Sequence, residues 1–121
     1  MKLFALVAIS AFASSASAQA VTVNLIEFKL TLSKDTVKAG KVSFAIKNDG
    51  RTTHAFRVVG GKIDKGSREL AKSEAATLQL DLAPGTYEVF CPLAEGSHKM
   101  AGMVKKIVVL PADAAPMKKK P

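Results

Sequence analysis

The sequence predicts an all-β fold, a Greek-key antiparallel β-sandwich of about seven to eight strands. From Val21 onward, short runs alternate apolar and polar residues, and turn-forming residues interrupt them about every eight to twelve positions. Alternation with period two is typical of strands that bury one face. Many short strands separated by regular turns are typical of a sandwich, so one compact β domain is expected.

The N-terminal residues have the features of a secretory signal peptide. Lys2 precedes an apolar stretch from Leu3 to Ala13, and Ala16-Ser17-Ala18 supplies small residues for cleavage. We expect cleavage after Ala18, with Ala20 as the alternative. The apolar stretch is shorter than the roughly 20 residues that a membrane anchor needs, and no later segment of that length lacks charges. The predicted product is a soluble, exported, periplasmic protein without a transmembrane segment.

The predicted domain covers residues 19–110. Removal of residues 1–18 takes Lys2 away, which leaves 17 basic and 10 acidic side chains and a formal net charge of +7. Residues 111–121 contain three consecutive lysines and little apolar surface, so we predict a disordered basic tail.

The first predicted strands lie between Val21 and Lys47. Two runs are separated by Glu27, at which we expect a bulge or bend, and a third follows the turn at 38–40. The residues expected on inward faces are Val21, Val23 and Leu25, then Phe28, Leu30 and Leu32, then Val42, Phe44 and Ile46.

The later strands follow the turn Asn48-Asp49-Gly50. Period two places His54 on the inward face with Phe56 and Val58. Residues 60–76 are irregular, with one short helical turn expected near 69–72. The strand 77–82 is expected to form a hairpin with 86–91 through Pro84-Gly85, and a final strand runs from Met103 to Leu110. On the return strand, Tyr87, Val89 and Cys91 share the inward face.

Cys91 is the only cysteine in the chain. A lone thiol in an exported protein is exposed to oxidation unless it is buried or holds a metal. Both explanations are open from the cysteine alone, because free cysteine is among the most buried residue types.

A thiol, an imidazole and two thioethers lie within thirteen residues, at Cys91, His98, Met100 and Met103, and His54 is the only other histidine. A thiolate, two imidazoles and a weak axial thioether suit a copper ion that changes oxidation state, whereas zinc prefers a tetrahedral site without the thioether. For His54 alone, a core histidine bonded to the backbone is the simpler interpretation. The constellation as a whole favours one copper ion per chain.

These residues resemble the small blue copper proteins, or cupredoxins, in their exported bacterial form. The resemblance covers most of the mature chain and rests on Val37-Lys-Ala-Gly40, Asn48-Asp-Gly50 before His54, Pro84-Gly85-Thr-Tyr87, and Cys91, His98 and Gly102-Met103. It implies a cupredoxin-like sandwich with His54, Cys91, His98 and Met103 as type 1 copper ligands and Met103 axial.

Two positions depart from the family pattern. Six residues separate Cys91 from His98, more than is usual, and Ala55 stands where many members have an asparagine that braces the ligand loop. Asn48 is the candidate for part of that bracing role. Met100 is the alternative thioether, placed only two residues after His98.

The predicted function is one-electron transfer, and no enzyme activity is expected because four ligands leave no open position for substrate. The basic charge favours a transient acidic redox partner, such as a cytochrome, an oxidase or a copper reductase. We expect a monomer and no nucleic-acid partner, since the chain has one tyrosine and no tryptophan for base stacking. The alternatives are a copper chaperone or resistance protein, and an enzyme with a Cys-His pair, which would need a third orienting group.

Overall fold

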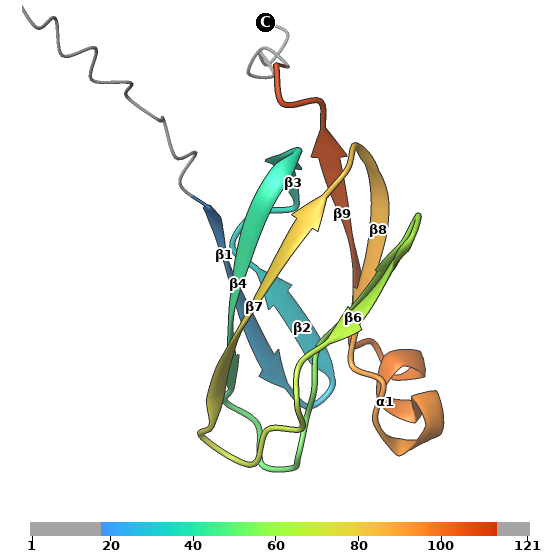
Figure 1. The fold of residues 1–121 in the computed structure, drawn as a ribbon. Coiled ribbons are helices and arrows are strands. Elements are labelled where there is room, and N and C mark those ends of the chain that lie inside the picture. The colour runs from blue at the N-terminus through green and yellow to red at the C-terminus, as the bar shows by residue number, and fades with distance from the viewer. Residues whose placement is uncertain (1–17, 114–121) are drawn as a thin grey trace, which may run out of the picture.

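The computed structural model describes residues 18–113 and forms two β-sheets that face each other (Figure 1). The strands are β1 (Gln19–Ile26), β2 (Lys29–Leu32), β3 (Thr36–Lys38), β4 (Gly40–Asn48), β5 (Arg57–Gly60), β6 (Ile63–Gly66), β7 (Ala75–Leu82), β8 (Gly85–Phe90) and β9 (Val104–Leu110). A 3-10 turn η1 (Ala94–Gly96) and a single helical turn α1 (Ser97–Met100) lie between β8 and β9.

The two sheets have the orders β2-β1-β4-β7 and β3-β9-β8-β5-β6. The predicted β-sandwich is therefore confirmed, with nine strands in the described residues. The sheets are mixed, because β1 pairs with β4 and β3 pairs with β9 in parallel, and the other pairings are antiparallel. Both parallel pairs arise where the chain crosses to the other sheet between the two partners.

The core lies between the sheets and uses the predicted inward faces. Alternate residues of β1, β4 and β8 are buried, and the Phe44 and Phe56 rings pack with centroids 5.2 Å apart. Phe28 differs from the prediction: it precedes β2, is 50% exposed, and does not share the buried position of Leu30. Glu27 and Phe28 form the tight turn between β1 and β2.

The hairpin predicted at Pro84-Gly85 is wrong. β7 pairs with β4, whereas β8 pairs with β5 and β9 in the opposite sheet, so this turn carries the chain from one sheet to the other. The Tyr87 hydroxyl donates to the Ala83 carbonyl oxygen across 2.7 Å and ties the crossing to β8. Turn chemistry fixes the reversal of the chain but not the sheet that receives the next strand.

The helical turn predicted near residues 69–72 is also wrong. Leu70 instead forms an isolated bridge with His54, and its carbonyl also accepts a hydrogen bond from the Asn48 side chain. These tertiary hydrogen bonds outweigh the local helix propensity of the segment. The irregular stretch before it contains β6, and neither β3 nor the helical turn α1 was predicted.

The predicted signal peptide, residues 1–18, falls almost wholly outside the described residues, as does the predicted tail after Asp113. Both stay predictions. Within residues 18–113, no helix has the length and apolar character needed to span a membrane.

Candidate metal centre

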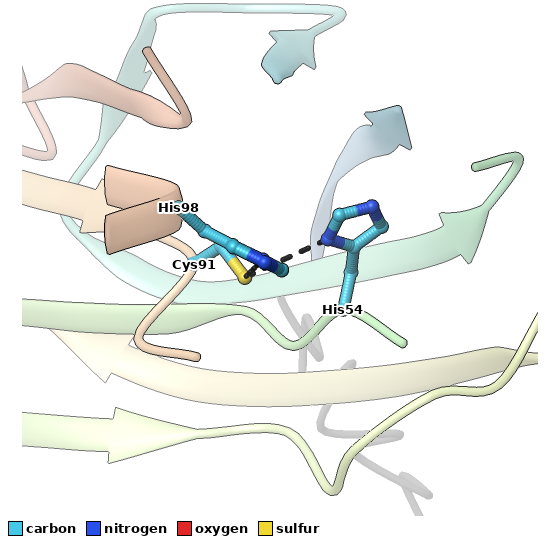
Figure 2. A group of neighbouring side chains, drawn as sticks. All are labelled: His54, Cys91 and His98. Carbon is cyan, nitrogen blue, oxygen red and sulfur yellow. Dashed lines mark hydrogen bonds between the residues drawn. The ribbon is translucent and has the colours of Figure 1, made fainter. Parts of the chain in front are cut away.

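Three of the predicted ligands, His54, Cys91 and His98, meet at one end of the sandwich, next to α1 (Figures 1 and 2). The Cys91 Sγ atom lies 3.9 Å from Nδ1 of His54 and 3.6 Å from Nδ1 of His98. One potential ligand atom from each residue lies within 4.8 Å of the others. Cys91 and His54 are fully buried and His98 is partly buried, so the cluster opens to the surface through His98.

Cys91 owes its position to the alternation of β8. Tyr87 and Val89 point into the core, and Cys91, directly after the strand, keeps the same parity. Its backbone N–H donates to the Met103 carbonyl across 3.0 Å, at the end of the β8–β9 ladder. The thiol is thus placed by the sheet itself.

His98 is brought to Cys91 by the helical turn α1. The Ser97 hydroxyl donates to the Ala94 carbonyl across 2.6 Å, and Gly96 adopts φ +87°, which favours glycine. These turns take up the six-residue interval between Cys91 and His98. The Met103 N–H then donates to the His98 carbonyl across 3.1 Å, so the loop closes on the site.

Lys99 fixes the outer side of α1. Its ammonium forms an ion pair with Glu88 on β8 and lies 4.3 Å from the centroid of the Phe90 ring. Both partners belong to the strand that leads to Cys91, so α1 is held against that strand by a side chain adjacent to His98.

His54 is held by backbone and by side chain. Its N–H and carbonyl pair with Leu70 across 3.0 and 2.8 Å, and its Nε2 lies 3.0 Å from Oε1 of Glu27. An ionised carboxylate only accepts hydrogen bonds, so Nε2 carries the proton and donates. In the neutral imidazole the other nitrogen, Nδ1, is then the acceptor, and it is the one that faces Cys91, as a metal-binding imidazole requires.

Glu27 is the site residue that sequence reasoning missed. Hydrogen bonds lower the pKa of Glu27 to about 2, and the largest effect comes from the Thr52 backbone N–H, 2.7 Å from Oε1. The hydrogen bond with His54 lowers the pKa further, whereas burial of the carboxylate raises it. One usable signal was present in the residue order, namely a charged residue between two strand-like runs. That signal did not identify the histidine that the carboxylate reaches across 27 positions of the chain.

Gly50 lies against this pair. A Cβ atom at this position would lie 2.5 Å from the Glu27 carboxylate and 2.8 Å from Nε2 of His54. The predicted Asn48-Asp49-Gly50 turn therefore has a second requirement beyond its backbone conformation, namely space for the Glu27–His54 hydrogen bond.

Asn48 braces the segment before His54, in line with the role predicted for it. It is fully buried, its amide donates to the carbonyls of Thr52 and Leu70 at 2.8 Å each, and its Oδ1 accepts from the Gly50 N–H at 2.9 Å. Asn48 thus holds the loop that leads to His54, through Thr52, and also Leu70, which pairs with His54 in the β-bridge.

The two candidate thioethers lie in opposite environments. Met103 is fully buried and its backbone bonds to both Cys91 and His98, whereas Met100 is 88% exposed at the end of α1. The burial and backbone contacts support the axial role of Met103, which stays a prediction.

Phe28 covers His98 from the β1–β2 turn. The two rings meet edge to face with centroids 5.4 Å apart, and the His54 and His98 rings meet in the same manner at 5.1 Å. Gly102 allows this approach, since a Cβ there would lie 2.8 Å from the Phe28 carbonyl oxygen. Phe28 therefore lies outside the core because its ring packs against the partly buried His98.

The donor set fits a single metal ion. Metal–sulfur and metal–nitrogen bonds are about 2.3 and 2.0 Å long, so a sulfur and a nitrogen that bind one ion lie at most about 4.3 Å apart. The distances from the Cys91 sulfur to Nδ1 of His54 and of His98 both satisfy this limit. A thiolate with two imidazoles and a weak thioether is the donor set of a type 1 copper site. Figure 2 shows a nitrogen of His54 directed at the Cys91 sulfur, with the His98 ring beside the sulfur.

Fold and site together define a small β-sandwich metalloprotein with a mononuclear copper site between strand ends. The chain belongs to the cupredoxin family, because the sequence model of that family's cupredoxin-like domain matches residues 1–108. No curated protein sequence matches the chain.

Solved structures with the same fold include reduced auracyanin from the photosynthetic bacterium Roseiflexus castenholzii, with 18% identity, a TM-score of 0.68, and coverage of 78% of this chain and 98% of that one. Auracyanin A from Chloroflexus aurantiacus, a "blue" copper protein, has 19% identity, a TM-score of 0.64, and coverage of 74% and 97%. A copper nitrite reductase from Nitrosomonas europaea has 18% identity, a TM-score of 0.65, and coverage of 84% and 45%. At these identities the likeness concerns the fold.

Proposed function

We propose that this protein is a periplasmic copper-binding electron carrier, with one type 1 copper ion held by His54, Cys91 and His98 and by Met103 as the axial ligand. The observation that carries the proposal is the buried cluster of one thiol and two Nδ1 atoms, 3.6 and 3.9 Å from the sulfur. Auracyanin A, a "blue" copper protein that shares the fold, supports the same assignment.

Copper supplies a one-electron couple at such a site. The protein contributes a rigid set of donors: Cys91 and Met103 are joined by a backbone hydrogen bond, and His54 is fixed by Leu70 and Glu27. Donors that do not move between oxidation states keep the reorganisation on each electron transfer small. Four protein ligands also leave no open position for substrate, so we propose a carrier and not an enzyme.

The proposed partner is an acidic redox protein, such as a cytochrome, an oxidase or a copper reductase, that a monomer meets transiently. The support is the +7 charge of the chain after residue 18, which steers association with negatively charged surfaces. The partly buried His98, beside the half-exposed Phe28, is the proposed path for the electron.

The second candidate is a copper chaperone or resistance protein that carries the ion as cargo. Met100 favours it, because a thioether that is 88% exposed and two residues from His98 can act as a transient soft ligand during copper exchange.

Visible spectroscopy and metal transfer separate the two functions. A carrier gives an intense thiolate-to-copper band that ascorbate bleaches reversibly, with copper retained through repeated cycles. A cargo protein releases copper(I) to a competing chelator at a rate that falls when Met100 is replaced by leucine. Release that is slow and insensitive to Met100→Leu eliminates the second candidate.

A further inference from the structure

The carboxylate of Glu27 is the one charged group that hydrogen-bonds to a proposed ligand from outside the ligand set, within residues 18–113. Its Oε1 lies 3.0 Å from Nε2 of His54, on the side of the imidazole that faces away from Cys91. Its side chain is 23% exposed and that of His54 is fully buried, so water has little access to the pair.

The same oxygen is held by the loop that precedes His54. Oε1 accepts from the backbone N–H groups of Arg51 and Thr52 at 2.6 and 2.7 Å, and from the Thr52 hydroxyl at 3.0 Å. These donors hold the carboxylate in place from the loop that leads to His54. Gly50 supplies the space, since a Cβ there would overlap the oxygen.

We infer that Glu27 is a positioning residue that acts on the copper through His54, in two separable ways. As an acceptor it holds the proton on Nε2 and aims Nδ1 at the site. As a fixed negative charge it favours the more positive, oxidised state of the metal and so lowers the reduction potential. This inference rests on the proposed copper site.

Both effects have a general basis. A hydrogen bond from a ligand imidazole to a carboxylate fixes the tautomer and raises the basicity of the ligand, and loss of such a partner typically costs 10- to 100-fold in metal affinity. An anion near a buried site also interacts more strongly with the ion than it would in water. A neutral acceptor reproduces the first effect and not the second.

The test compares Glu27→Gln, Glu27→Ala and Glu74→Gln in the full domain. Glutamine retains a carbonyl oxygen where all four donors meet but removes the charge, and alanine removes both. Glu74 is a matched control: it also accepts a backbone hydrogen bond, from Ala71, and its pKa is also lowered, but it contacts none of the four proposed ligands.

We expect Glu27→Gln to lower the preference for copper(II) over copper(I) about tenfold, which raises the one-electron potential by about 59 mV. Glu74→Gln should leave the potential unchanged. In the metal-free proteins, nitrogen NMR of the His54 ring should show the Nε2–H tautomer in the wild type and Glu27→Gln, and a mixture in Glu27→Ala.

An unchanged potential in Glu27→Gln overturns the charge effect, and an unchanged tautomer in Glu27→Ala overturns the positioning effect. If Glu27→Ala does not fold, the tautomer is compared in Glu27→Leu, which keeps the side-chain bulk without an acceptor. Failure of the proposed function is a distinct result, since it removes the copper band from the wild type itself.

A second inference rests on a different observation, the groove between β2 and β9. This groove has a volume of about 360 Å³, and its lining includes four exposed lysines, Lys29, Lys34, Lys105 and Lys106, with Asp35 as the one acidic residue. Within residues 18–113, the ion pairs of the protein involve other cations.

The groove adjoins the proposed copper site. β2 begins directly after Phe28, whose ring contacts His98, and β9 begins directly after Met103. A partner bound here would lie next to the partly buried edge of the site. Four exposed lysines against one acidic residue give the groove a positive charge, which suits an extended acidic protein surface.

We infer that this lysine groove is where the acidic face of the redox partner docks; this too rests on the proposed electron transfer. The probe is an acidic c-type cytochrome, mixed with reduced protein in a stopped-flow experiment. The groove variant Lys29→Gln/Lys105→Gln/Lys106→Gln is compared with Lys41→Gln/Lys62→Gln/Lys72→Gln, which removes the same charge from exposed lysines outside the groove.

At low salt the second-order rate constant should fall at least tenfold in the groove variant and less than twofold in the control. The difference should vanish near 1 M salt, where the Debye length is about 3 Å. Equal losses in both variants would overturn the inference and assign the steering to net charge. If the groove variant lost its rate constant to the same extent with hexacyanoferrate as the oxidant, the inference would also be overturned, because the groove would then be a site for small anions.

Discussion

The backbone N–H of Cys91 donates to the carbonyl of Met103 across 3.0 Å, so the loop that carries three of the four proposed ligands closes on itself. The Met103 N–H in turn donates to the His98 carbonyl. Two backbone hydrogen bonds therefore link the residues that carry the thiol, the imidazole and the thioether.

The first prediction concerns the axial ligand. Met103→Leu should retain the blue colour and raise the reduction potential, because loss of the weak thioether donor disfavours copper(II). Met100→Leu, at the 88% exposed position, should leave the potential near the wild-type value. Voltammetry of both variants makes the comparison, and the reverse pattern would transfer the axial role to Met100.

The second prediction concerns the space beside the His54–Glu27 pair. Gly50→Ala should destabilise the domain by about 1–3 kcal/mol, because its Cβ would meet Glu27 at 2.5 Å and His54 at 2.8 Å. Copper affinity should fall as well, since His54 must shift. Denaturant unfolding of the metal-free protein measures the first effect and competition with a chelator the second. Wild-type values in both would show that the packing is looser than described.

The third prediction concerns the brace before His54. Asn48→Ala removes three side-chain hydrogen bonds from a fully buried position, so the free energy of unfolding should fall by about 3 kcal/mol. Asn24→Ala is the control, because Asn24 makes one side-chain bond, to Asp49, and its loss should cost no more than about 1 kcal/mol. Equal losses in the two variants would remove the special role given to Asn48.

Much of the fold was predictable because the period of two is read directly from residue order. Alternation identified the buried faces of β1, β4 and β8, and it placed Cys91 on the inward side of its strand from parity alone. Strand pairing is different in kind. Nothing local to Pro84-Gly85 states which sheet receives β8, and the short β3 and β6 strands owe their state to the neighbours they pair with.

The site shows the same division. His54, Cys91, His98 and Met103 were selected by residue type and spacing, and the structure brings the first three within 4.8 Å. Glu27 was missed because its partner lies 27 residues away and the contact depends on how two turns pack. The path of the long interval before His98 could not be predicted either, since it depends on the Ser97–Ala94 hydrogen bond, on the positive φ of Gly96 and on the contacts that Lys99 makes with β8.

The fourth prediction concerns acid stability. The Ala71 N–H, followed by Arg68, holds the pKa of Glu74 below its ordinary value of 4.5. A carboxyl with a lowered folded pKa stabilises the fold above the unfolded pKa, and that contribution is lost as the pH falls through the folded pKa. Glu74→Gln should therefore lower the melting temperature at pH 7 and have a smaller effect at pH 3. A gap of equal size at both pH values would contradict the role of the ionised form.

In the proposed site, Cys91, His54 and His98 hold one copper ion whose colour and redox chemistry come from the thiolate. The most direct measurement is the visible spectrum of the protein lacking residues 1–18 after addition of one equivalent of copper(II). We expect an intense thiolate-to-copper band that ascorbate bleaches and that Cys91→Ser abolishes. His54→Ala or His98→Ala should convert it to the weak spectrum of an ordinary copper(II) protein. A colourless protein with full copper occupancy would contradict it.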